Sequence, residues 1–132
     1  MQESLKEGVN AVRTVEVDGG RTIDFMGEDL RVYATPELVR DIEYTCRDLL
    51  FEHLDDGEDS VGTRVEIDHT GATLLGMSVN ISAAIVSIAG RLVTFDVTAE
   101  DSVEPIAKCT HTRFVVETAK LKERLKAKAA KA

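Results

Sequence analysis

The chain has 132 residues, which is the size of one domain with a single hydrophobic core. Its hydrophobic content of 43% and its two prolines are typical of a globular protein rather than a disordered one. No apolar run approaches the roughly 20 residues of a membrane helix, and the first eight residues lack the hydrophobic block of a secretory signal. We therefore expect one soluble domain over residues 1–132, located in the cytoplasm, with Cys46 and Cys109 as buried free thiols.

The charge is unevenly distributed. The formal net charge is −8, yet residues 120–132 hold six basic side chains and one acidic one. The remaining body, residues 1–119, holds 10 basic and 23 acidic side chains, a net charge of −13. A body this acidic repels a nucleic-acid backbone, which argues against DNA or RNA binding. The basic C-terminal tail is expected to be a helix, either frayed or docked.

The first half of the chain predicts one strand and one long helix. Residues 11–17 are typical of a strand closed by a glycine turn, and residues 21–32 have no clear period, so we expect an irregular cover there. Thr35 as N-cap and Pro36 at the first helical position predict a helix start. Apolar residues at helical spacing continue to Leu54, where the helix should end.

The second half predicts four strands, over residues 60–67, 77–88, 92–99 and 106–117. The alternation slips at residues 84–86, which predicts a bulge. Because most of the connections are short, an antiparallel meander is the simplest arrangement. The fold class is therefore α+β, a five-stranded antiparallel sheet covered by one long helix. One helix leaves the other face and the edges uncovered, so we expect a dimer that joins two sheets.

Two polar residues lie where the apolar pattern alone would not put them. Glu43 falls at the margin of the helix's apolar stripe, where a carboxylate pressed against apolar surface suits general acid–base work. The alternative is a glutamate at the rim that reaches water. His69 continues the inward face of its strand and is a candidate acid or base. The competing interpretation is a core histidine that is hydrogen-bonded to backbone.

Three further positions each have both a structural and a functional interpretation. Gly62 interrupts a strand, which indicates either a bulge or a close approach to its backbone, for example as an oxyanion-hole amide. Arg113 shares a strand face with apolar neighbours and needs a partner or an anionic ligand. Thr35 is fully explained as an N-cap, although a helix N-terminus also favours developing negative charge. We interpret His53 and His111 as structural.

Several short stretches keep a specific order and spacing over residues 32–116. They are Val32-Tyr33-Ala34-Thr35, Ile42-Glu43-Tyr44-Thr45-Cys46, Ser60-Val61-Gly62-Thr63, His69-Thr70-Gly71-Ala72-Thr73, Gly76-Met77-Ser78-Val79 and Thr110-His111-Thr112-Arg113. On these stretches the chain resembles the hotdog-fold thioesterases, closest to the fluoroacetyl-CoA thioesterase family. The resemblance implies a sheet wrapped around one central helix and a homodimer, with a tetramer left open.

The resemblance also implies the roles of individual residues. Thr35, Glu43 and His69 would form the catalytic set, Gly62 would supply a substrate-binding amide, and Arg113 would bind substrate. The implied substrate is a small acyl-CoA, with coenzyme A as part of the substrate and no separate cofactor or metal. Attack by water and an anhydride intermediate on the carboxylate both remain open.

Two departures from the family pattern bear on the substrate. Pro36 stiffens the backbone after Thr35, and residues 25–30 hold a single aromatic where the resemblance implies an aromatic lid. We therefore expect the thioesterase chemistry without selectivity for fluoroacetyl. The phosphates of coenzyme A should lie at a local basic spot, for which Arg91, Lys108 and the tail lysines are available. If none of these lies near the acyl site, pantetheine or a smaller thiol is the alternative carrier. The alternatives are a non-catalytic acyl-CoA-binding domain and, on the same fold, an acyl-CoA hydratase.

Overall fold

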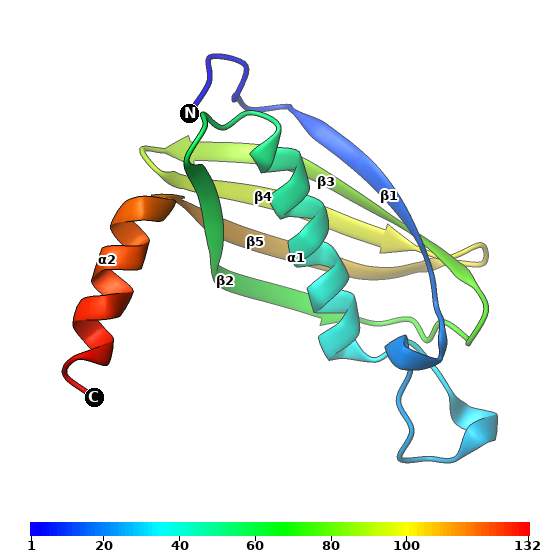
Figure 1. Ribbon diagram of the computed structural model, residues 1–132. Coiled ribbons are helices and arrows are strands. Elements are labelled where there is room, and N and C mark those ends of the chain that lie inside the picture. The colour runs from blue at the N-terminus through cyan, green and yellow to red at the C-terminus, as the bar shows by residue number, and fades with distance from the viewer.

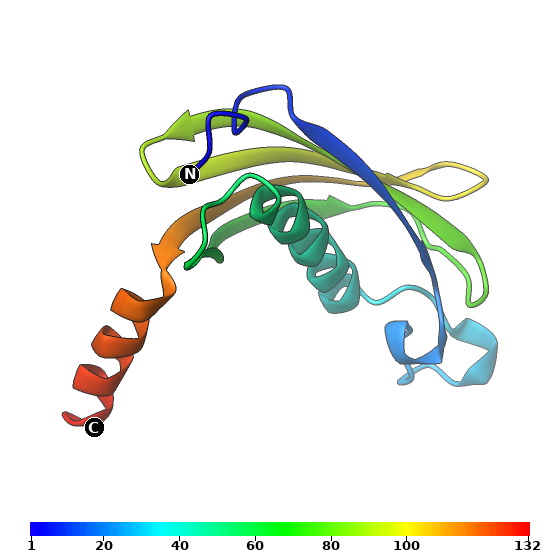
Figure 2. The same ribbon diagram turned by 45° about the horizontal axis from the view of Figure 1, so that its top comes forward.

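A computed structural model describes residues 1–132 as a curved antiparallel sheet with one helix on its concave face (Figures 1 and 2). The strands and helices are β1 (Asn10–Glu16), α1 (Thr35–Phe51), β2 (Glu58–His69), β3 (Ser78–Ala89), β4 (Leu92–Glu100), β5 (Pro105–Glu117) and α2 (Thr118–Ala129). The α+β class and all five predicted strands are confirmed. No helix of the protein combines the length and the apolar character that crossing a membrane requires.

The strand order is β1-β3-β4-β5-β2, which corrects the predicted meander in one respect. β3, β4 and β5 are joined by hairpins as expected, but β2 pairs with β5 and not with β3. The connection between β2 and β3, residues 70–77, is longer than a hairpin turn. Eight residues reach up to about 26 Å, and three strand spacings amount to about 14 Å. The chain therefore crosses the end of the sheet, and β2 becomes an edge strand.

The core lies between α1 and the concave face of the sheet. The apolar stripe of α1 is buried there, as are the inward residues of β3, β4 and β5. Among the fully buried side chains are Leu38, Ile42, Leu50, Ile81, Ile85, Val93, Phe95 and Ile106. Cys46 and Cys109 are buried free thiols, as predicted, and burial raises the pKa of Cys46 to about 12 and that of Cys109 to about 11.

The start of α1 differs by one residue from the prediction. Ala34 occupies the N-cap position without a side-chain cap, and its carbonyl accepts the first helical bond, from the amide of Leu38, at 3.0 Å. The predicted N-cap, Thr35, is the first helical residue, and Pro36 is the second. The prediction was wrong because the Thr35 hydroxyl has another partner, described below. The helix also ends at Phe51, three residues before Leu54.

Register shifts occur in three strand pairs, one of them near the end of β4 against β5, between Ala99 and Glu100. The register of β3 against β4 shifts between Ile85 and Ser87, which confirms the predicted bulge. The register of β2 against β5 shifts between Gly62 and Arg64, so the structural interpretation of Gly62 is also correct.

Two segments project from the sheet. α2 continues from β5 and extends away from the sheet (Figures 1 and 2), so the tail is a helix that is not docked on its own domain. The segment predicted to be irregular contains two single-turn 3-10 helices, Gly19–Arg21 and Glu28–Leu30. Its tip, residues 24–30, is exposed throughout.

Candidate active site

Thr35 and His69 meet where the start of α1 approaches the end of β2. The hydroxyl oxygen of Thr35 lies 2.8 Å from Nδ1 of His69. The other ring nitrogen, Nε2, is buried and has no hydrogen-bond partner within the chain. Burial lowers the pKa of His69 below its ordinary value of 6.5, which favours the neutral imidazole. The pair therefore presents an oriented, neutral histidine with one nitrogen free for proton transfer.

Glu43 and Gly62 meet about the middle of α1. A Cβ atom placed on Gly62 would lie 3.0 Å from Oε1 of Glu43, so the carboxylate contacts β2 where a side chain is missing. Glu43 is half-buried and forms no ion pair. Both reasons predicted for a glycine at position 62 are therefore present: Glu43 approaches the backbone closely, and the strand has a bulge.

Arg113 is a buried cation beside this pair. Its Nε donates to the Ser60 hydroxyl at 2.8 Å, and its Nη2 donates to the Ser60 carbonyl at 2.9 Å. No carboxylate forms a salt bridge with it, and burial lowers the pKa of Arg113, against the attraction of the Glu43 charge. Its Nη1 lies 3.5 Å from the position of a Gly62 Cβ. The guanidinium therefore directs positive charge at the space next to Glu43 and Gly62.

The two remaining histidines have structural contacts. His111 is fully buried, and its Nδ1 donates to the Arg64 carbonyl at 2.8 Å. Its Nε2 is then free to accept from Nη1 of Arg113 at 3.2 Å, and burial lowers the pKa of His111. His111 thus acts as a positioning residue for the guanidinium. His53 lies at the far end of α1, with its Nδ1 2.8 Å from the Ser4 hydroxyl.

The predicted site residues form two groups rather than one. Thr35 and Glu43 are eight residues apart on α1, about 12 Å along the helix axis. Gly62 and His69 are seven residues apart on β2, about 23 Å along the strand. Within one chain, the structure brings Thr35 together with His69, and Glu43 together with Gly62 and Arg113.

Sequence reasoning missed two arginines beside Glu43. An open cleft of about 370 Å³ is lined by Arg40, Glu43, Tyr44, Arg47 and Arg113. The Arg40 guanidinium stacks over the Tyr44 ring, 5.6 Å from its centroid, and has no ion pair. Arg40 precedes Glu43 by three residues and Arg47 follows it by four, which places all three on one helix face. The spacing of three and four residues around Glu43 is the sequence signal that identifies Arg40 and Arg47.

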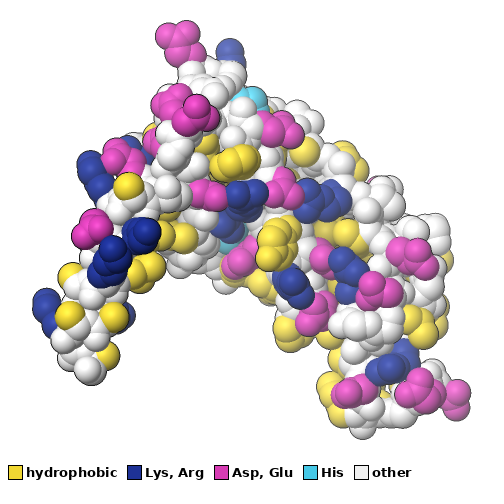
Figure 3. Space-filling model, in the orientation of Figure 1, with side chains coloured by type: hydrophobic (Ala, Val, Ile, Leu, Met, Phe, Trp, Pro, Cys, Tyr) yellow, Lys and Arg dark blue, Asp and Glu magenta, His cyan; other side chains and the backbone are white.

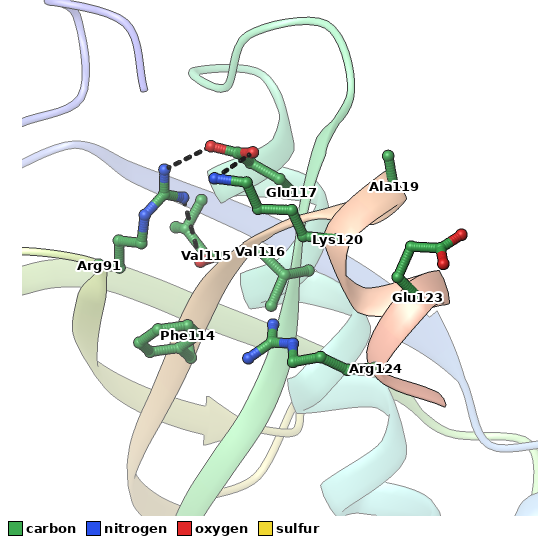
Figure 4. Close-up of a pocket in the computed structure, with 9 residues that line it drawn as sticks. All are labelled: Arg91, Phe114, Val115, Val116, Glu117, Ala119, Lys120, Glu123 and Arg124. Carbon is green, nitrogen blue, oxygen red and sulfur yellow. Dashed lines mark hydrogen bonds and ion pairs between the residues drawn. The ribbon is translucent and has the colours of Figure 1, made fainter. Parts of the chain in front are cut away.

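The basic residues expected to hold coenzyme A phosphates lie elsewhere in the chain. Arg91 and Lys120 line a cavity of about 660 Å³ between β5 and α2 (Figure 4). Both pair with Glu117, at 3.4 Å and 3.1 Å. Lys108 lies in a separate cleft with Glu66, Asp68 and Asp96. Neither cleft contains Glu43 or His69. Arg40 and Arg47 of α1 line the cleft of Glu43 together with Arg113, and Arg47 is paired there with Asp59 and Asp48.

Comparison with known proteins places this arrangement among the hotdog-fold thioesterases. A sheet curved over one helix is shared with a thioesterase superfamily member from Thermus thermophilus, at 27% identity and a TM-score of 0.86, covering 99% of this chain and 100% of that one. The chain belongs to the fluoroacetyl-CoA-specific thioesterase family, whose model matches residues 17–119.

Relatives within the family agree over most of their length. The fluoroacetyl-CoA thioesterase of Streptantibioticus cattleyicolor is 34% identical over 97 residues, which are 74% of this chain and 70% of that protein. A crystal structure of a mutant fluoroacetyl-CoA-specific thioesterase has a TM-score of 0.87 at 28% identity, covering 96% of this chain and 99% of that one.

Proposed function

We propose that this protein is an acyl-CoA thioesterase that works as a homodimer, and that each active site combines Glu43, Gly62 and Arg113 of one protomer with Thr35 and His69 of the other. Membership of a thioesterase family supports the reaction. The observation that carries the site is the approach of the Glu43 carboxylate to the bare backbone of Gly62. A carboxylate next to bare backbone leaves room for a small carbonyl group and suits attack on it.

The edge position of β2 supports the dimer. β2 pairs with β5 on one side only, so its other side leaves backbone N–H and C=O groups unpaired. Two apolar side chains on it, Val61 and Val65, are 40% and 37% exposed. Antiparallel pairing of two β2 strands across a two-fold axis satisfies these groups outside the bulge at Gly62. Such pairing brings the Gly62 half of one strand alongside the His69 half of the other, which unites the two groups of site residues.

Glu43 and His69 take part in different steps of the hydrolysis. The Glu43 carboxylate either attacks the thioester carbonyl carbon or takes a proton from an attacking water. If Glu43 attacks, its oxygen forms a C–O bond to the acyl carbon as the C–S bond breaks, and water then hydrolyses this anhydride to release the acid and free the carboxylate. If water attacks, the water oxygen forms the C–O bond as the C–S bond breaks, and Glu43 takes the water proton. In both routes the thiolate gains a proton from Nε2 of His69, and water supplies the proton that replaces it. The Gly62 amide would stabilise the oxyanion, and losing one such donor typically costs about 3 kcal/mol of barrier. Thr35 would hold the imidazole in the required orientation.

The surroundings of Glu43 indicate the substrate class. Arg40, which forms no ion pair, lines the cleft of Glu43 in an otherwise acidic body, whereas Arg47 in the same cleft is paired with Asp59 and Asp48. The positive charge of Arg40 favours coenzyme A as the thiol carrier. Residues 25–30 offer one aromatic side chain, Phe25, which is 78% exposed within a single chain. We therefore propose a small acyl group and no preference for fluoroacetyl. Both cysteines are free thiols, in keeping with a cytoplasmic location.

Free-thiol release from a panel of thioesters tests the activity. The panel contains acetyl-, fluoroacetyl-, a medium-chain and an aromatic acyl-CoA, each assayed with the native protein and with Glu43→Gln. We expect turnover of at least one small acyl-CoA, reduced about 100-fold or more in the variant. Binding of acyl-CoA without turnover of any member would contradict the proposal and identify a non-catalytic binding domain.

A mixing experiment tests the shared site. Glu43→Gln and His69→Gln chains are mixed in equal amounts, unfolded together and refolded. If the site is shared, each mixed dimer has one site with both lesions and one intact site, so about one quarter of the native activity returns. If all site residues came from one chain, every site would carry a lesion and no activity would return.

A further inference from the structure

α2 is a helix without a partner in its own domain. None of its residues is buried, and its two leucines, Leu121 and Leu125, are half-buried and 57% exposed. They lie four residues apart on one face, and Lys128 follows at the next helical position of that face. Lys122, Arg124 and Lys128 form no ion pair, unlike Lys120 and Lys126. A 12-residue helix of this kind is marginal in water unless it packs against something.

The loop formed by residues 24–30 has the complementary composition. It contains Asp24, Glu28 and Asp29 and no basic residue. Its apolar side chains are also exposed, at 78% for Phe25, 52% for Met26 and 52% for Leu30. Of its three acids only Glu28 has a partner, Arg31, at 3.6 Å. Figure 3 shows dark-blue and yellow side chains along α2, and mainly magenta and yellow ones, with dark blue between them, at the projecting loop.

The two segments lie at opposite ends of β2. The Thr118 amide, at the start of α2, donates to the carbonyl of Gly57, the residue before β2, at 2.9 Å. The loop leads into Tyr33 and α1, whose first residue contacts His69 at the other end of β2. Both segments project toward the concave side of the sheet (Figures 1 and 2). A two-fold axis at the β2 edge exchanges the ends of the strand, so it places α2 of one protomer beside the loop of the other.

We propose that α2 of each protomer docks on the 24–30 loop of its partner, with Leu121 and Leu125 against the loop's apolar side chains and its unpaired cations against Asp24 and Asp29. This inference rests on the dimer proposed above. The occupant is a second copy of the chain because the charges complement each other and the contact continues the β2 interface. Since the loop leads directly to Thr35, docking holds it over the shared active site.

Disulfide trapping tests the contact. The double variant Leu125→Cys, Met26→Cys is oxidised mildly and examined on a non-reducing gel. Both native cysteines are buried, so the introduced thiols are the ones that react. We expect a covalent dimer. The matched control is Leu125→Cys, Val12→Cys, because Val12 is 65% exposed but lies on β1, at the opposite edge of the sheet. Equal cross-linking of the two variants, or none in either, would overturn the inference.

Charge reversal tests whether docking affects the site. The double variant Lys122→Glu, Lys128→Glu should raise KM several-fold, and adding Asp24→Lys, Asp29→Lys should restore it. A dimeric enzyme with native KM in every variant and no cross-link would overturn the docking and leave the proposed function standing. A monomeric, inactive native protein would overturn both. Co-sedimentation of the native protein with phosphatidylglycerol vesicles, without a cross-link, would instead assign α2 to a membrane surface.

Discussion

Replacing Gly62 by alanine adds one methyl group at the point where β2 meets Glu43. The new Cβ would lie 3.0 Å from Oε1 of Glu43, 3.2 Å from Cε1 of His111 and 3.5 Å from Nη1 of Arg113. The first two distances are shorter than ordinary van der Waals contact, so at least one neighbour must move by a few tenths of an ångström.

The carboxylate is the neighbour that moves. His111 is fully buried, stacks on Phe95 and is held by hydrogen bonds at both ring nitrogens. Glu43 is half-buried, lines an open cleft and has no ion pair to hold it. A misplacement of 1 Å can cost 100-fold in rate, so a shift of a few tenths should lower kcat about 10-fold. The added methyl group should lower the free energy of unfolding by about 1 kcal/mol, the low end for overpacking, because the Glu43 side chain can move into the open cleft.

Steady-state thiol release and thermal unfolding measure the two effects separately. A loss of about 1 kcal/mol should lower Tm by about 4 °C in a domain of this size. Gly19→Ala is the control, because a Cβ there would contact nothing within 4 Å. Native kcat in Gly62→Ala, or a rate loss that disappears once the unfolded fraction is subtracted, would refute the placement of Glu43 against Gly62 as catalytic geometry.

Three further outcomes follow from the contacts of the site. Thr35→Ala should leave Tm within about 2 °C of native, because Thr35 is not the N-cap and its loss avoids the cost of about 1 kcal/mol that a lost cap brings. The kcat of this variant should fall about 10-fold, whereas Thr35→Ser should keep the native kcat because it retains the hydroxyl beside His69. The folded-state pKa values of His69 and His111 lie below 6.5, so at lower pH the unfolded chain binds more protons than the folded one. The free energy of unfolding, from urea titrations at one chain concentration, should therefore fall as the pH drops below 6.5, and it should fall less in His69→Gln. A pH-independent free energy would contradict the burial of both rings. Arg113→Lys should lower the free energy of unfolding by about 1–3 kcal/mol, because an ammonium cannot hydrogen-bond to both Ser60 and His111 as the guanidinium does. An unchanged free energy of unfolding in urea would show that these hydrogen bonds contribute little.

Local pattern determined the elements. Strand patterns in five segments and the helical spacing before Leu54 predicted five strands and α1, because side-chain burial on one face repeats every two residues in a strand and every 3.6 in a helix. The slip at residues 84–86 was visible for the same reason. The motifs that carry the family resemblance also lie in short continuous stretches, so Thr35, Glu43, Gly62, His69 and Arg113 could be singled out without coordinates.

Long-range pairing was decided by the tertiary structure. An eight-residue connection permits either a loop to the neighbouring strand or a crossing of the sheet, and no local signal distinguishes them. That choice makes β2 an edge strand and leaves Gly62 exposed at the edge of the sheet. The N-cap was misassigned for a related reason: a hydroxyl at a helix start satisfies the local pattern equally well whether it caps the helix or contacts a histidine 34 residues away.

The sequence by itself therefore determined the fold class, the elements and the residue types available for chemistry, because these depend on neighbours along the chain. Only the tertiary structure decided which of those residues meet. It placed Thr35 with His69 and Glu43 with Gly62, and it left about 12 Å of helix between the two groups. Contacts between distant segments depend on how the whole sheet is ordered, which no local stretch of the chain specifies.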